Sequence, residues 1–227
     1  MARIHDFTQG IFSIITQNIF FFIKSGFFFI LSILPTLIWI LFVERSMLDL
    51  LFLFLIGPAV SAICRLMIDY IETDFSKDDY PDGARYLHHY RKNFKESLTF
   101  WIPYCVLMFI LMTNLQGYQW GHAYLQTAMT VVYVLFIALL TLFVGYFFLI
   151  SSKYSFPIPS LFRLSMYYIF TWIKSTLGIV AVLFLTMASI YFFSEWPALL
   201  LSSPLAYILV RYAYPVLENV GEYFVKK

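Results

Sequence analysis

The chain has 227 residues, of which 61% are hydrophobic and 12% are charged, and its formal net charge is +2. Because soluble domains average about 25% charged residues, a chain this apolar cannot hide its side chains inside a water-soluble globule. The composition excludes an ordinary soluble protein and gives no basis for a nucleic-acid partner. It indicates a single all-α membrane domain over residues 1–227.

Residues 1–24 combine apolar positions at helical spacing with frequent polar interruptions, which predicts an N-terminal helix lying in the membrane interface. They lack the basic, apolar and small-residue pattern of a cleaved signal peptide. The first membrane span is predicted at residues 25–42. Pro35 is expected to kink this span, because proline removes a backbone donor and clashes one turn back.

A second span is predicted at residues 48–67, with Gly57 and Pro58 at its midpoint. The pair predicts a break or kink, since proline cannot complete the helical hydrogen-bond pattern. Carbonyl groups freed by such a break must be satisfied by neighbouring groups or by a cavity. The pair therefore indicates either a kink packed against another helix or part of a binding site.

The main cytoplasmic connection is predicted at residues 68–99, the only long polar stretch of the chain. After a predicted turn at 78–83, aromatic residues recur every four positions, which places them along one side of a helix. Basic side chains follow the opposite face. We therefore predict a basic amphipathic helix that lies at the membrane surface and leads into a span. The candidate partner or lipid contacts are Arg85, Tyr86, Tyr90, Arg91, Lys92, Phe94 and Lys95.

This basic helix has three interpretations. Its cations satisfy the excess of Lys and Arg that cytoplasmic loops carry, which needs no further function. They also suit contact with the headgroups of anionic membrane lipids. Aromatic side chains interleaved with arginine are typical of protein interfaces, so a docking surface for another protein is the third interpretation.

The remaining apolar segments complete a helical bundle of about six transmembrane helices. Pro204 is expected to kink the last of them, which is short enough to be re-entrant instead. With six spans and both termini in the cytoplasm, every Lys and Arg except Arg45 lies on the cytoplasmic side, as the positive-inside rule requires. These later spans are predicted at 100–115, 127–150, 173–193 and 198–217.

The sequence contains no motif typical of a catalytic or nucleotide-binding site. His88 and His89 are adjacent, so on a helix they diverge by about 100° and cannot ligate one metal as a pair. Cys64 and Cys105 fall in apolar segments and are expected to be buried, unpaired side chains. The interiors of the spans up to residue 193 hold no Asp, Glu, Lys, Arg or His, which argues against an ion-coupled pump. We therefore predict a non-enzymatic protein without metal or cofactor.

Several short motifs resemble the YesL-like family of bacterial polytopic membrane proteins, whose function is unknown. The aromatic, basic and Asn-Phe-Lys residues before the third predicted span carry most of the likeness. The matching residues are Leu34-Pro35-Thr36, Gly57-Pro58-Ala59-x-x-Ala62 and Tyr86-x-x-x-Tyr90-Arg91-Lys92-Asn93-Phe94-Lys95-Glu96-Ser97.

The resemblance implies a role in carbohydrate uptake, because genes for such proteins commonly neighbour sugar ABC-transporter genes in Gram-positive bacteria. The expected function is an accessory or regulatory protein of the bacterial cell membrane, with membrane lipids and ABC permease and ATPase subunits as its partners. A small stand-alone transporter of a neutral solute is the alternative expectation, and a membrane enzyme is the third.

Overall fold

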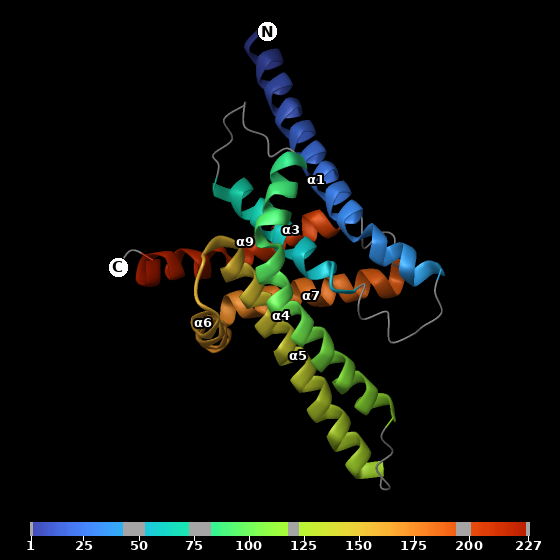
Figure 1. The fold of residues 1–227 in the computed structure, drawn as a ribbon. Coiled ribbons are helices and arrows are strands. Elements are labelled where there is room, and N and C mark those ends of the chain that lie inside the picture. The colour runs from blue at the N-terminus through green and yellow to red at the C-terminus, as the bar shows by residue number, and fades with distance from the viewer. Residues whose placement is uncertain (1, 43–52, 73–82, 118–122, 194–200, 226–227) are drawn as a thin grey trace.

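The computed structural model describes residues 2–42, 53–72, 83–117, 123–193 and 201–225, and within these ranges the protein is all-α (Figure 1). The expected all-α membrane fold is confirmed at this level. The helices are α1 (Ala2–Phe42), α3 (Ile56–Glu72), α4 (Gly83–Gly117), α5 (Ala123–Lys153), α6 (Ile158–Thr171), α7 (Ile173–Phe193), α9 (Ser202–Val220) and the short π-helix η1 (Gly221–Val225).

Three of the described helices are long and apolar enough to cross a membrane. They are residues 16–39 of α1, the whole of α4, and residues 124–153 of α5. The pair α6 and α7 meets the same test only when taken together, with a bend of 95° between its two helices. The described residues thus provide three spans, or four if the bent pair is one span, against the predicted total of about six.

The predicted second and sixth spans correspond in part to α3 and α9, which are not among these candidates. Helix α3 has 17 residues, and both helices carry charged side chains that lower their mean hydropathy. Helix α3 is mostly buried against other helices, and α9 buries one face in the bundle. Residues 48–52 and 198–200 of the two predictions lie outside the described ranges.

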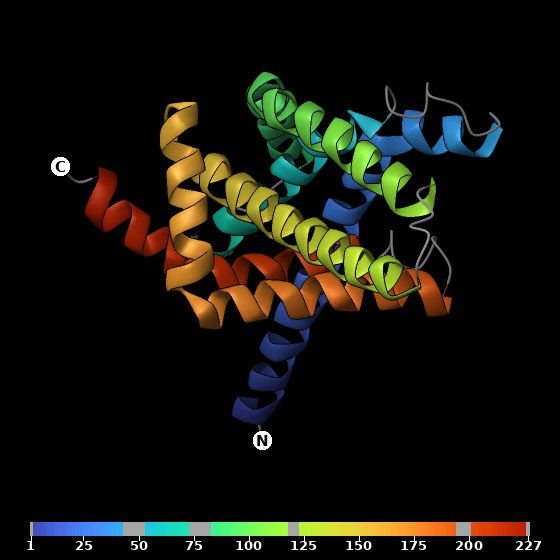
Figure 2. The same ribbon diagram turned by 90° about the horizontal axis from the view of Figure 1, so that it is seen from below.

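The helices arrange the molecule with two distinct ends. Figure 2 shows the C-terminal ends of α1, α4 and α7 at one end of the molecule, together with the start of α5. Helix α6 and the C-terminal end of α9 lie at the other (Figures 1 and 2). We call the latter the polar end, because it also contains the ion pairs of Arg65, Asp69, Glu72 and Lys153 described below. The chain therefore runs back and forth between two sides.

Helix α3 forms the centre of the core. Gly57 and Pro58 lie in its first turn, directly after a turn at Phe54 and Leu55, and the part of the predicted second span before residue 53 lies outside the described residues. A proline is tolerated there because the first turn has no intrahelical partner for its missing donor. Gly57 permits close packing, since a Cβ at this position would lie 2.5 Å from Cγ of Trp101.

Two other predicted boundaries, at Lys24 and at Pro204, differ in the structure. Helix α1 continues through Lys24, whereas the sequence predicts an interfacial helix that ends there and a separate span after it. Pro35 lies inside α1. Pro204 lies in the first turn of α9 and therefore cannot kink its interior, while Pro215, which sequence reasoning did not single out, lies within the helix.

Hydroxyl pairs connect helices within this apolar bundle. Ser25 of α1 and Ser203 of α9 are both buried, and their Oγ atoms lie 2.6 Å apart. The Tyr146 hydroxyl lies 2.9 Å from Oγ1 of Thr176, which joins α5 to α7. Each contact satisfies polar atoms that lipid or apolar side chains would leave without a partner. These pairs therefore help to fix which helices are neighbours.

The outer surface of the bundle is apolar. Leu135 of α5 is 63% exposed and Phe184 of α7 is 71% exposed. Exposed apolar side chains also follow the outside of α1 and the second half of α4. A continuous surface of this kind is costly in water and is stable against lipid. Further members are Phe20, Phe27, Leu31, Val106, Ile110, Val132, Phe136 and Met187.

Candidate functional site

The candidate site lies where α3 and α4 pack together as an antiparallel pair. At one end of the pair, Nε1 of Trp101 donates a hydrogen bond to the Leu53 carbonyl at 2.7 Å. Toward the other end, Nε2 of His89 lies 2.8 Å from a carboxylate oxygen of Asp69. Later residues of α3 thus meet earlier residues of α4. This arrangement brings the charged C-terminal turns of α3 against the polar beginning of α4.

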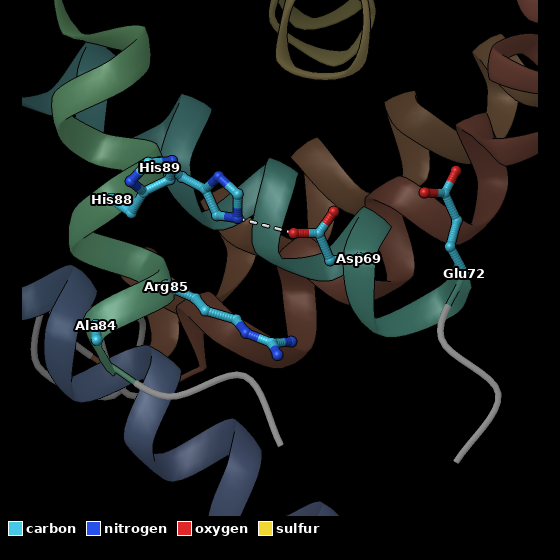
Figure 3. A pocket seen from close by; sticks show the side chains of 6 residues that line it. All are labelled: Asp69, Glu72, Ala84, Arg85, His88 and His89. Carbon is cyan, nitrogen blue, oxygen red and sulfur yellow. Dashed lines mark hydrogen bonds and ion pairs between the residues drawn. The ribbon is translucent and has the colours of Figure 1, made fainter. Parts of the chain in front are cut away.

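Asp69 is the centre of the charged contacts between these two helices. Its carboxylate accepts from Arg65, one turn earlier on α3, at 3.1 Å, and from His89 of α4 (Figure 3). The Asp69 and His89 side chains are only 21% and 14% exposed. Because the contacts are partly shielded from water, they are stronger than an exposed pair on a single helix. They fix the rotation of α4 relative to α3.

A second ion pair ties α3 to α5. Lys153, the last residue of α5, pairs with Glu72, the last residue of α3, with 2.5 Å between the charged atoms. The Lys153 ammonium also lies 5.4 Å from the centre of the Tyr154 ring and 5.1 Å from that of Tyr214 on α9. Aromatic faces attract cations at such distances. The polar end is therefore held together by contacts among three helices.

An open cleft of about 510 Å³ lies between α3 and α4 at this end. Figure 3 shows the Arg85 side chain extending from α4 toward α3, below the Asp69 carboxylate. The two acidic residues of the cleft come from α3, and its basic and imidazole groups come from α4. The cleft is lined by Asp69, Glu72, Ala84, Arg85, His88 and His89.

The aromatic residues that recur every four positions at the start of α4 are Tyr86, Tyr90 and Phe94, and in the structure they face other helices. Tyr86 is fully buried, with its ring centre 6.2 Å from that of Phe28 on α1 and 6.4 Å from that of Tyr90. Tyr86 therefore cannot contact a partner or a lipid, contrary to the prediction. Tyr90 and Phe94 are half-buried, so the stripe is chiefly the inward face of α4. Apolar spacing alone does not show whether such a face meets protein or lipid.

The basic residues predicted as contacts remain on the outside of α4. Arg85, Arg91, Lys92 and Lys95 are all exposed, and of these Arg85 alone lines the cleft. The helix therefore separates two basic surfaces. One is Arg85 at the cleft, and the other, which we call the outer basic row, consists of Arg91, Lys92 and Lys95.

Sequence reasoning did not identify the ion pairs of the cleft. The spacing of Arg65 and Asp69, four residues apart on a helix, is a recognisable signal for one of them. The contact between His89 and Asp69 depends on how two helices pack, and the pairing of Lys153 with Glu72 joins residues far apart in the sequence. Among the described residues, no group of three or more His, Cys, Asp or Glu side chains is arranged to hold a metal ion.

These features define an all-α protein with the apolar outer surface of a membrane protein and a charged cleft at one end of its helix bundle. Residues 17–115 match the model of a family described as "Protein of unknown function, DUF624", which is the YesL-like family. The match covers fewer than half of the residues, but it includes α3 and nearly all of α4, and hence both walls of the cleft. No curated protein and no solved structure matches the chain.

Proposed function

We propose that the protein is a non-enzymatic accessory or regulatory protein of the cell membrane of a Gram-positive bacterium, associated with a carbohydrate ABC transporter. The observation that carries this proposal is the outer basic row of α4, presented at the polar end of an apolar bundle. The expected partners are the permease and ATPase subunits of the transporter. The family resemblance supports this choice of partner.

The outer basic row is suited to docking because its backbone is held in place before any partner arrives. The opposite face of α4 is fixed by buried Tyr86 and by the contact of His89 with Asp69. A preorganised surface loses less entropy on binding than a flexible one. Exposed cations held in fixed positions attract an acidic surface on a neighbouring subunit and align it for binding.

The proposed orientation places the polar end in the cytoplasm. Basic residues of α3, α4 and α6, with Lys153 at the end of α5, belong to this end, and cytoplasmic segments carry an excess of Lys and Arg. The excess of Lys and Arg on this side in the predicted six-span arrangement supports an even number of crossings. Both termini are then cytoplasmic, and the outer basic row faces the compartment that contains the ATPase subunits.

The test is a double charge reversal, Arg91→Glu with Lys92→Glu, in full-length protein tagged at its C-terminus. Both side chains are exposed, so the fold should persist and the amount of protein in the membrane should not change. We expect the co-purified permease and ATPase subunits, measured by mass spectrometry after extraction in mild detergent, to fall about tenfold. Loss of one or more charged interface contacts is sufficient for such a change.

The matched control reverses two exposed basic residues on other helices, Arg163→Glu with Lys174→Glu. This variant changes the net charge equally and should retain the transporter subunits. Unchanged co-purification in the Arg91 and Lys92 variant would overturn the role of this surface. If the wild-type protein purifies as a homo-oligomer without transporter subunits, and takes up a neutral solute alone in liposomes, it is the stand-alone transporter.

A further inference from the structure

We propose that α6 lies in the plane of the membrane interface and presents its outward surface to phospholipids, so that α7 crosses the membrane without it. The apolar part of this surface contacts the acyl chains, and its basic part contacts the headgroup phosphates. The surface is separate from the outer basic row of α4 and does not involve the proposed transporter partner.

The direction of α6 is set by its bend against α7. The two helices meet at Trp172 with an angle of 95° between them. Helix α6 is seen end-on in Figure 1, whereas α5 and α7 run across the view. Helix α7 has 21 residues, and at 1.5 Å per residue its length is close to the hydrocarbon thickness of about 30 Å. A helix perpendicular to one that crosses the membrane lies parallel to the membrane plane.

The level of α6 follows from the surface of α7. Lys174 is exposed in the first turn of α7, and no Asp, Glu, Lys, Arg or His follows it in this helix. The chain turns away from the axis of α7 just before Lys174, so Lys174 lies at the end of an apolar surface and not within it. A cation in this position marks the headgroup level. The exposed apolar side chains of that surface are Leu177, Val180, Phe184, Met187 and Tyr191.

One stripe of the outward surface of α6 is apolar, and its residues recur every four positions along one side of the helix. Three of its four members are between 50% and 65% exposed. The ring centre of Phe162 lies 4.7 Å from that of Phe143 on α5. Phe143 is about 15 Å of helix away from Lys153 at the polar end, so the stripe faces the membrane interior. We call it the acyl stripe, and it consists of Ile158, Phe162, Met166 and Phe170.

The neighbouring stripe of α6 is polar. Arg163 and Tyr167 are exposed one turn apart. At the headgroup level a guanidinium group reaches lipid phosphates while its aliphatic part packs on apolar surface, and tyrosine prefers the same level. Lys174 adds a second cation, and residues 154–193 contain no Asp or Glu. We call it the headgroup stripe, and it consists of Ser160, Arg163, Tyr167 and Thr171.

A broken span made of α6 and α7 together fits these side chains less well. It would carry Arg163 into the hydrocarbon region, where a charged side chain is costly. It would also place the headgroup stripe against acyl chains. An in-plane α6 instead continues the apolar surface of α7 with its acyl stripe and keeps both cations beside the phosphates.

The experiment measures depth in full-length protein reconstituted into liposomes of phosphatidylcholine and phosphatidylglycerol. Spin labels are attached to single cysteines at exposed positions, in Phe162→Cys and Phe170→Cys for the acyl stripe and in Ser160→Cys and Tyr167→Cys for the headgroup stripe. Depth is obtained from the accessibility of each label to oxygen, which enters lipid, and to a nickel chelate, which stays in water.

We expect the labels at Phe162→Cys and Phe170→Cys to lie at equal depth, about 5–10 Å into the boundary between headgroups and acyl chains. The labels at Ser160→Cys and Tyr167→Cys should be accessible to the nickel chelate. If Phe162→Cys does not fold, Ile158→Cys tests the same stripe.

Three results would overturn the proposal. A steady increase in depth from position 160 to position 170 would make α6 the first half of a broken span. Access of the nickel chelate to all four positions would place the acyl stripe in water. Exclusion of both reagents from the acyl stripe would show that a second copy of the chain covers it.

Two controls calibrate the depth measurement. Labels at Leu177→Cys and Phe184→Cys follow α7 into the membrane and should differ in depth by about 10 Å. The native cysteines Cys64 and Cys105 are buried, so labelled wild type gives the background signal.

A charge reversal tests the headgroup contact. Arg163→Glu with Lys174→Glu should raise the accessibility of the label at Phe170→Cys to the nickel chelate at least about twofold, because lipid phosphates repel carboxylates. The matched control, Arg91→Glu with Lys92→Glu, should leave this accessibility unchanged and lose the transporter subunits. Equal changes in the two variants would overturn the headgroup contact. Failure of the transporter proposal therefore remains distinguishable from failure of this one.

Discussion

At the scale of single residues, Asp69 connects the two helices that form the walls of the cleft. One carboxylate contacts Arg65 on its own helix and His89 on the next, and it is mostly shielded from water. Removing the charge of such a group leaves its partners without compensation. The position of α4 relative to α3 therefore depends on a side chain that a hydropathy plot records only as a charge near the end of an apolar segment.

We predict that Asp69→Asn lowers the free energy of unfolding by about 1–3 kcal/mol, because charge-assisted hydrogen bonds to two partners are weakened together. The measurement is unfolding of the purified protein in a titration with denaturing detergent, followed by tryptophan fluorescence. Trp101 reports on the same helix pair through its hydrogen bond to Leu53. A variant as stable as the wild type would show that the contacts of Asp69 do not hold the two helices together.

The matched control for this substitution is Glu222→Gln, which also neutralises one carboxylate. Glu222 is exposed in the short helix η1. Substitutions at exposed positions of this kind usually change the free energy of unfolding by less than about 0.5 kcal/mol. The contrast between the two variants separates the specific contacts of Asp69 from a general effect of net charge.

The sequence predicted on which face of its helix a site residue lies, but it did not predict which residues of other helices that side chain contacts. The four-residue spacing of Tyr86, Tyr90 and Phe94 correctly placed them on one side of a helix, opposite the basic residues. It did not show that this side faces α1 and α3. The contacts of Asp69 with His89 and of Glu72 with Lys153 depend on the packing of separate helices, which local periodicity does not contain.

At the scale of helices, close approach at glycine positions the C-terminal helix α9 against α7. A Cβ at Gly178 would lie 2.5 Å from Cγ of Tyr212 and 2.8 Å from its Cβ. These atoms are near the backbone of α9, so they cannot move aside by rotating the end of the side chain. The two helices can approach this closely only because residue 178 has no side chain.

We predict that Gly178→Ala destabilises the protein by about 1–3 kcal/mol, since the added methyl group must push α9 away from α7. The measurement is the midpoint of unfolding in denaturing detergent. The matched control is Gly145→Ala in the interior of α5, where a Cβ would meet nothing within 4 Å. There the better helix propensity of alanine should leave stability unchanged or raise it by up to about 1 kcal/mol. Equal effects at both positions would contradict close packing at Gly178.

Apolar runs predicted the existence of the helices more reliably than their ends. The predicted segment 173–193 coincides with α7, and 127–150 lies within α5 (Ala123–Lys153). By contrast, α4 includes both the predicted surface helix and the predicted span as one helix of 35 residues. A helix can continue through polar residues when tertiary contacts cover one of its faces, and buried Tyr86 makes such contacts at the start of α4. Composition alone does not show where such contacts occur.

At the scale of the whole molecule, the apolar composition established a helical membrane protein but not the number of its spans. Both α3 and α9 carry charges, but α3 is mostly buried against other helices and α9 buries one face in the bundle, so neither needs to be as apolar as a helix that lipid surrounds. A hydropathy argument treats every helix as if lipid surrounded it. In the structure, some helices have an apolar outer surface suited to lipid, whereas others pack mainly against neighbouring helices.

The positions of the helix ends predict which residues lie on the same side of the membrane. Helix α4 has 35 residues, and at 1.5 Å per residue its length of about 50 Å exceeds the hydrocarbon thickness of about 30 Å. Its beginning belongs to the polar end, whereas its last residue, Gly117, lies at the opposite end with the start of α5 (Figure 2). The two ends of α4 should therefore face different compartments.

Single cysteines at four exposed positions test this arrangement with a membrane-impermeant thiol reagent. Ala84→Cys and Glu222→Cys should react only after the cells are opened, whereas Gly117→Cys and Tyr124→Cys should react in intact cells. The native cysteines Cys64 and Cys105 are buried, with 4% and 6% of their surfaces exposed, so the wild type provides a control with a low background. Labelling of positions 84 and 117 from the same side would contradict a membrane-spanning α4, because the hairpin of α4 and α5 would then enter and leave the membrane on one face.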